Sequence, residues 1–226
     1  TQLMLVAWLW LATLSAAKFR IAPRVELFMF MLCVHRVLVA PVIYIVFDVS
    51  AGDHLLWFIH VIKYGVAIAA VPIGIAVTLA IIESWRPAPG FEIERNALLF
   101  SILLFGAGGI IGFMISGSTV TVPAHYHGSI VGITIAFMGV TYHLLPQLGF
   151  RKVDGRVARW QPGIYGCGQL MHIVGLAWSG GYNVARKSTE VEHGIEQTLG
   201  LGLMGFGGLV SIIGGVMFLV LVYLAM

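Results

Sequence analysis

The stretch that decides the fold is "TVPAHYHGSIVGITIAFMGVTYHLLPQLGF", residues 121–150. It can cross a bilayer as one helix, since a span needs about 20 mostly apolar residues. Two histidines, His125 and His127, stand near its start, separated by one tyrosine. A polar, titratable side chain is unfavourable in hydrocarbon unless a partner satisfies it. The pair therefore predicts a bound ligand or a hydrogen-bonding neighbour.

The apolar character of this stretch extends to the whole chain. Of the 226 residues, 59% are hydrophobic and 10% are charged, whereas soluble domains carry roughly 25% charged residues. The net charge of +3 is small, and no continuous basic surface suggests nucleic-acid binding. Cys33 and Cys167 both lie in apolar runs and fit neither a CxxC metal site nor a disulfide framework. The composition predicts an all-α integral membrane protein.

Seven transmembrane segments are predicted, with Pro and Gly marking the breaks between them. We expect one transmembrane helical domain over residues 1–226. Because the chain begins at Thr1 in apolar sequence, we expect it to be processed or to be the later part of a larger or split protein. The segments are 3–17, 26–47, 54–82, 96–116, 123–146, 162–181 and 198–225.

Loops rich in Lys and Arg alternate along the chain with the other loops, as expected for seven spans. The second and fourth loops contain no Lys or Arg, and the sixth holds Arg186 and Lys187. The odd loops are expected to face the cytoplasm, so the His125–His127 end and the sixth loop share the opposite face. The basic residues of the odd loops are Lys18, Arg20 and Arg24, then Arg86 and Arg95, and then Arg151, Lys152, Arg156 and Arg159.

Helical geometry separates the two histidines. Each residue turns a helix by about 100°, so His125 and His127 point roughly 200° apart and cannot bind one metal ion together. Two ligands on opposite sides of one membrane helix suggest two haems, each bound through one imidazole. Gly128 and Gly132 would let a haem ring or another helix approach closely. Arg186 and Lys187 could bind haem propionates, or could be an ordinary basic pair beside the membrane.

Single histidines have a simpler explanation. A lone membrane histidine commonly forms a hydrogen bond with a neighbouring helix. We prefer that interpretation for His35, His54, His60, His143, His172 and His193.

Three stretches resemble subunit I of the haem-copper oxidases, closest to the B-type branch. "STVTVPAHYHGSIVGITIAFMGVTYHLLPQLG" resembles the tenth helix of that family, and "GLAWSGGYNVARKS" (175–188) resembles the next helix with its propionate-binding loop. "WFIHVIKYGVAIAAVPIGIAVTLA" (57–80) resembles the eighth helix. The family's usual Pro-Arg-Arg is Ala185-Arg186-Lys187 here. The resemblance covers nearly the whole chain, as the later half of subunit I.

The resemblance implies a role for each matched residue. His125 would be the proximal ligand of a high-spin haem. His127 would be one axial ligand of a low-spin haem, whose second histidine must come from other sequence or another chain. Arg186 and Lys187 would hold propionates.

One departure from the family concerns copper. The family binds copper with a His-His pair at the end of the seventh helix and a histidine from the sixth. Matching Pro41-Val42 and Ile59-His60 puts Ile45 and Val46 at the pair, and neither side chain can bind copper. His35 lies about ten residues earlier, which is about 15 Å along a helix. We therefore expect two haems and no copper.

The sequence predicts a haem-binding electron-transfer subunit of a respiratory oxidoreductase complex, with oxygen reduction by this chain not expected. Its expected partners are membrane subunits that supply the missing helices and axial histidine, and quinone or cytochrome c. The expected location is a bacterial or archaeal cytoplasmic membrane rather than the mitochondrial inner membrane. One alternative is a genuine terminal oxidase or nitric oxide reductase. The other is a cofactor-free transporter or structural subunit.

Overall fold

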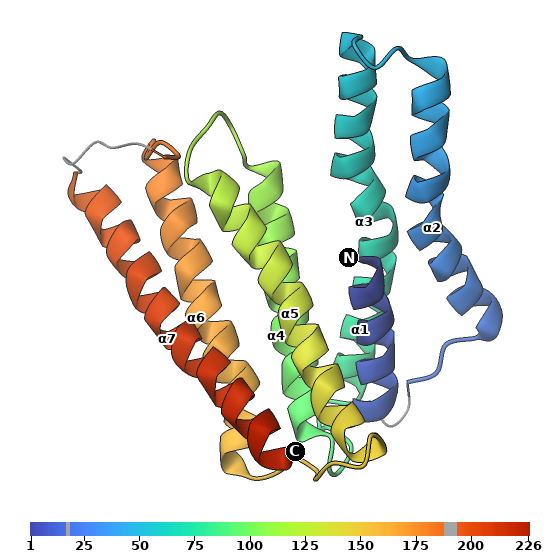
Figure 1. The fold of residues 1–226 in the computed structure, drawn as a ribbon, viewed down its shortest axis with the longest axis vertical. Coiled ribbons are helices and arrows are strands. Elements are labelled where there is room, and N and C mark those ends of the chain that lie inside the picture. Colours follow the sequence, from blue (N-terminus) through green and yellow to red (C-terminus); the bar gives the residue numbers. More distant parts are fainter. Residues whose placement is uncertain (17–18, 188–193) are drawn as a thin grey trace. The chain divides into compact units, whose positions relative to one another are not determined.

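The computed structural model describes residues 1–16, 19–187 and 194–226 as an all-helical chain (Figure 1). The predicted fold class is confirmed, since the described residues contain seven helices and no strand. Lys18 and His193 lie outside the described residues. The helices are α1 (Gln2–Ser15), α2 (Pro23–Val46), α3 (Gly52–Glu83), α4 (Glu92–Phe113), α5 (Thr121–Gln147), α6 (Arg156–Gly181) and α7 (Ile195–Ala225).

Five of these helices are long and apolar enough to cross a membrane: α2, α3, α4, α5 and α7. Helix α1 is apolar but has 14 residues, which gives a length of about 21 Å against the 30 Å of a bilayer core. Helix α6 has 26 residues, but polar side chains such as Arg156, Arg159 and Gln161 lower its apolar character. The seven predicted segments therefore correspond to seven helices of unequal hydropathy.

The chain forms two compact units, residues 1–87 and 88–226. In the first unit, α1 and α2 each pack against α3. The buried face of α1 includes Leu5 and Leu11, and that of α3 includes Ile73 and Val77.

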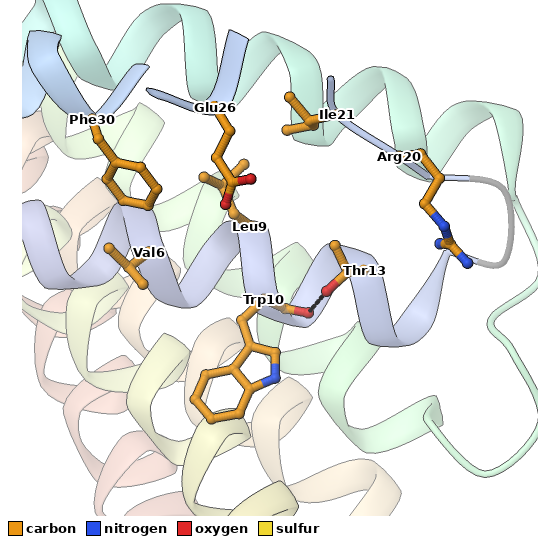
Figure 2. Close-up of a pocket in the computed structure, with 8 residues that line it drawn as sticks. All are labelled: Val6, Leu9, Trp10, Thr13, Arg20, Ile21, Glu26 and Phe30. Atoms are coloured by element: carbon orange, nitrogen blue, oxygen red, sulfur yellow. Dashed lines mark hydrogen bonds between the residues drawn. The ribbon is translucent and has the colours of Figure 1, made fainter. Parts of the chain in front are cut away.

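A surface groove of about 360 Å³ lies between α1 and the start of α2 in the first unit. Figure 2 shows its apolar floor on α1, and Glu26 of α2 reaching over it. Its lining residues are Val6, Leu9, Trp10, Thr13, Arg20, Ile21, Glu26 and Phe30.

In the second unit, α5 packs against both α4 and α6. Glycine allows the backbones of α4 and α5 to meet: a Cβ placed on Gly128 would lie 2.6 Å from the Gly108 Cα. One turn further, the buried Ser101 hydroxyl donates to the Gly132 carbonyl at 2.6 Å. Gly128 and Gly132 therefore admit a neighbouring helix rather than a haem ring.

Helices α6 and α7 run side by side in close contact (Figure 1). Gly200, Gly207 and Gly214 recur every seven residues on α7 and meet the backbone of α6, where Gly168 and Gly175 have the same spacing. Small residues at such a spacing let membrane helices approach closely and gain packing energy. This seam fixes the register of α6 against α7.

Arg95 differs from the sequence prediction, which placed it in the third loop. Helix α4 begins at Glu92, so Arg95 lies in the first turn of the helix and is 2% exposed. The neighbouring Glu94 is also buried, with one carboxylate oxygen 3.9 Å from His143 Nδ1 of α5. The helix begins earlier than predicted because an apolar run marks only the hydrocarbon-compatible part of a helix, whereas the acidic Glu92 and Glu94 favour a helix N-terminus.

The glycine seam gives a test of packing. Gly207→Ala should lower the free energy of unfolding by about 1–3 kcal/mol, because overpacking a tight contact is destabilising. The new Cβ would lie 2.5 Å from the His172 amide nitrogen. Gly205→Ala is the matched control, since a Cβ there meets nothing within 4 Å, and alanine is the better helix former. Thermal unfolding in detergent measures both, and equal melting temperatures would contradict the close contact.

Candidate cofactor site at the start of helix α5

The first two turns of α5 direct their imidazoles to different neighbours. The His125 ring lies against α4, where its Nδ1 is 2.7 Å from the Gly108 carbonyl oxygen. The His127 ring lies against α6, where it meets the ring of His172. The predicted separation of the two side chains is confirmed, because residues two apart on a helix cannot share one face.

His125 is half-buried and held in one orientation. A carbonyl oxygen only accepts, so the His125 Nδ1 carries the proton in this contact, and the lone pair lies on Nε2. Gly112 provides the space: a Cβ there would lie 2.6 Å from His125 Nδ1. An imidazole with Nδ1–H bonded to a backbone carbonyl is the usual form of a histidine that binds a metal through Nε2.

His127 is exposed, and its ring meets His172 of α6 edge-on. The two ring centroids are 4.7 Å apart and the rings are inclined by 61°. His172 in turn contacts α7, with its Nδ1 3.0 Å from the Met204 carbonyl oxygen. The sequence treats His172 as an isolated histidine, because it lies 45 positions from His127 along the chain.

A short backbone bridge brings the loop after α6 to the start of α5. Thr119 and Ala185 form an isolated antiparallel bridge. On either side of it, the Val120 amide donates to the Val184 carbonyl at 3.0 Å, and the Arg186 amide donates to the Ser118 carbonyl at 2.8 Å. The prediction that this loop and the two histidines share one end of the bundle is confirmed.

The two cations of this loop are placed differently. The Arg186 guanidinium carbon lies 5.9 Å from the ring centre of Tyr126, the residue between the two histidines. This distance allows a cation–π contact. Both side chains are exposed, and the Lys187 backbone is left-handed, with φ of 62°. Of the two, Arg186 is the cation that the structure places near Tyr126.

The residues matched to copper ligands lie in the other unit. Ile45 and Val46, in the last turn of α2, are 84% and 62% exposed. Among the residues that the structure describes, no three His, Cys, Asp or Glu side chains group together as a metal site. The absence of copper stays a prediction from the sequence match.

Two imidazoles on different sides of one apolar helix, with the exposed Arg186 5.9 Å from the ring of Tyr126, match the arrangement that the sequence resemblance implies. A family model described as cytochrome c and quinol oxidase polypeptide I matches residues 56–217. The chain belongs to this family. As a cytochrome c and quinol oxidase polypeptide I protein with five apolar helices, it is an integral membrane protein. The B-type branch stays a prediction.

Two curated relatives of this oxidase family member are uncharacterized proteins. One, from Rickettsia prowazekii (strain Madrid E), is 40% identical over 138 residues, covering 56% of this chain and 27% of the relative. The other, from Aquifex aeolicus (strain VF5), is 32% identical over 93 residues, covering 41% of this chain and 24% of the relative. The chain thus spans about a quarter of the length of the curated relatives it matches. No solved structure matches it.

The backbone bridge can be tested by cross-linking. Partners in an antiparallel bridge have Cα atoms about 4.5–5.5 Å apart, which is within disulfide range. Thr119→Cys with Ala185→Cys, in a background with Cys33 and Cys167 changed to Ser, should form a disulfide on mild oxidation. Trypsin cleavage in the basic segment 151–159 would then leave two fragments joined until reduction.

The two single-cysteine variants are the controls for this cross-link. Their tryptic fragments should separate with or without a reducing agent. A double variant whose fragments also separate under oxidising conditions would contradict the bridge and the position of Arg186 that depends on it.

Proposed function

We propose that this chain is a haem-binding electron-transfer subunit of a respiratory membrane complex. The observation that carries the proposal is the pair His125 and His127, which present imidazoles to opposite sides of one apolar helix. Family membership supports it, since haem binding is general in this family. The chain spans about a quarter of the length of its curated relatives, so its partners belong to the proposal as well.

The surroundings of His125 fit a proximal haem ligand. Its Nδ1 proton is committed to the Gly108 carbonyl, so Nε2 is the nitrogen that would bind iron. That hydrogen bond fixes the ring orientation and makes Nε2 more basic, and so a stronger ligand for a metal. Gly112, which has no side chain, leaves space for the His125 ring against α4. The position matched to copper ligands is apolar, so we propose that no copper is bound beside this haem.

His127 fits the axial ligand of a second haem. Its ring is exposed from this chain's own packing, which leaves room for a flat macrocycle and for a helix from elsewhere. That helix would supply the second axial histidine, either from another part of a longer chain or from a partner subunit. Because both histidines lie within one turn of the same helix, the two haems would be close enough for rapid electron transfer.

The cations of the α6–α7 loop fit haem propionates. The Arg186 guanidinium lies over the ring of Tyr126, the residue between His125 and His127 in the sequence. A guanidinium forms charge-assisted, often bidentate hydrogen bonds with a carboxylate. We assign Arg186 to this role and Lys187, which is exposed nearby, to a second propionate contact.

Bound haem supplies one-electron oxidation and reduction, and this chain would hold and tune the two groups. Quinone or cytochrome c is the proposed redox partner. The curated relatives are bacterial, and we place the complex in a bacterial cytoplasmic membrane.

Single substitutions of the two histidines test the proposal. His125→Ala should remove the high-spin haem signal and leave the low-spin one, and His127→Ala should do the reverse. The reason is that each imidazole faces a different neighbouring helix. Optical and electron paramagnetic resonance spectra of the purified complex measure both signals. Loss of both haems from either variant with the fold intact, or of neither, would contradict the assignment.

Metal content tests the copper position. The purified complex should contain iron but no stoichiometric copper, and its oxygen uptake with a reduced donor should be very slow or absent. Copper in that position needs about three converging imidazoles, and Ile45 and Val46 stand at two of these positions. Elemental analysis together with oxygen uptake makes the measurement. One copper per high-spin haem with fast, cyanide-sensitive uptake would instead show a terminal oxidase.

A further inference from the structure

We infer that His172 is a positioning residue for the low-spin haem ligand, accepting a hydrogen bond from the Nδ1–H of His127 when His127 binds iron. The inference rests on the proposed function. It assigns a purpose to a membrane histidine that the sequence leaves as a simple helix–helix contact.

The proton on His172 is fixed by its neighbour on α7. Its Nδ1 lies 3.0 Å from the Met204 carbonyl oxygen, which can only accept. A neutral imidazole has one N–H and one lone pair. The Nδ1 of His172 is therefore the donor to Met204, and its Nε2 is left as an acceptor in an apolar helix bundle.

His127 needs the partner that this lone pair offers. A histidine that binds iron through Nε2 carries its proton on Nδ1, and such a proton normally finds an acceptor. Within the part of the chain that the structure describes, the His127 ring makes no hydrogen bond of its own. The His172 ring lies edge-on against it, 4.7 Å between centroids.

The position of His172 is rigid. The α6–α7 seam holds its backbone, since a Cβ on Gly207 would lie 2.5 Å from the His172 amide nitrogen. The ring is held by the hydrogen bond from its Nδ1 to the Met204 carbonyl, 3.0 Å long. A rigid acceptor can fix the plane of the ring that it bonds.

Such a contact acts on the iron through His127. A hydrogen bond from Nδ1 raises the basicity of the liganding imidazole, which stabilises the ferric state over the ferrous state. The relay runs from the Met204 carbonyl through His172 to His127. Losing it should make the midpoint potential of the low-spin haem more positive and leave the His125 haem unchanged.

Potentiometric titration of the purified, haem-loaded complex provides the test. His172→Phe keeps a flat ring without an acceptor. It should reduce the affinity of His127 for ferric iron, relative to its affinity for ferrous iron, threefold to tenfold. That change makes the midpoint potential of the low-spin haem about 30 to 60 mV more positive, because a tenfold change corresponds to 59 mV for one electron. His172→Gln retains an amide oxygen acceptor and an N–H donor, so it should stay close to the wild-type potential.

A matched control is His143→Gln on the same helix as His127. It lies 16 residues further along, about 24 Å away, and should leave both potentials unchanged. If His172→Phe does not accumulate, His172→Met takes its place as a variant without a comparable acceptor.

Each outcome has one meaning. An unchanged low-spin potential in the acceptor-free variant overturns the role of His172 and leaves the haem assignment standing. Equal shifts in the Phe and Gln variants also overturn it, because then packing rather than the acceptor sets the potential. A wild-type complex without haem bound to this chain overturns the proposed function, and the inference with it.

Discussion

The contact between the backbones of α4 and α5 is the constraint on which the rest of the second unit depends. Gly108 and Gly128 remove the side chains that would hold these helices apart. At this spacing the Gly108 carbonyl of α4 is close enough to accept a hydrogen bond from His125 Nδ1 of α5, at 2.7 Å. A wider spacing would leave the His125 Nδ1–H without its acceptor in an apolar surrounding, where an unsatisfied donor is costly.

The same physical device operates on the other side of the bundle. Glycines every seven residues on α7 bring its backbone against α6, and the Met204 carbonyl then reaches His172. Close helix packing thus exposes carbonyls that fix the protonated nitrogen of an imidazole. In both places, small residues set the helix spacing, and the spacing sets which imidazole nitrogen keeps its lone pair.

The loops add a second constraint at the same end of the unit. The bridge between Thr119 and Ala185 ties the segment after α6 to the segment before α5. Because Arg186 follows Ala185 directly, the bridge also places Arg186 near Tyr126. A positive charge beside the two histidines lowers the energy of anionic groups there, which suits the carboxylates of the proposed haems.

The sequence by itself determined the membrane class, the seven helices and the opposite directions of His125 and His127, because each follows from composition, run length or the 100° turn of a helix. Its family motifs also indicated the resemblance that the family match confirms. Tertiary structure alone decided the burial of Arg95, the acceptor of His125 and the contact between His127 and His172. These depend on residues 17 to 45 positions apart, and on a helix spacing that glycines permit but only packing selects.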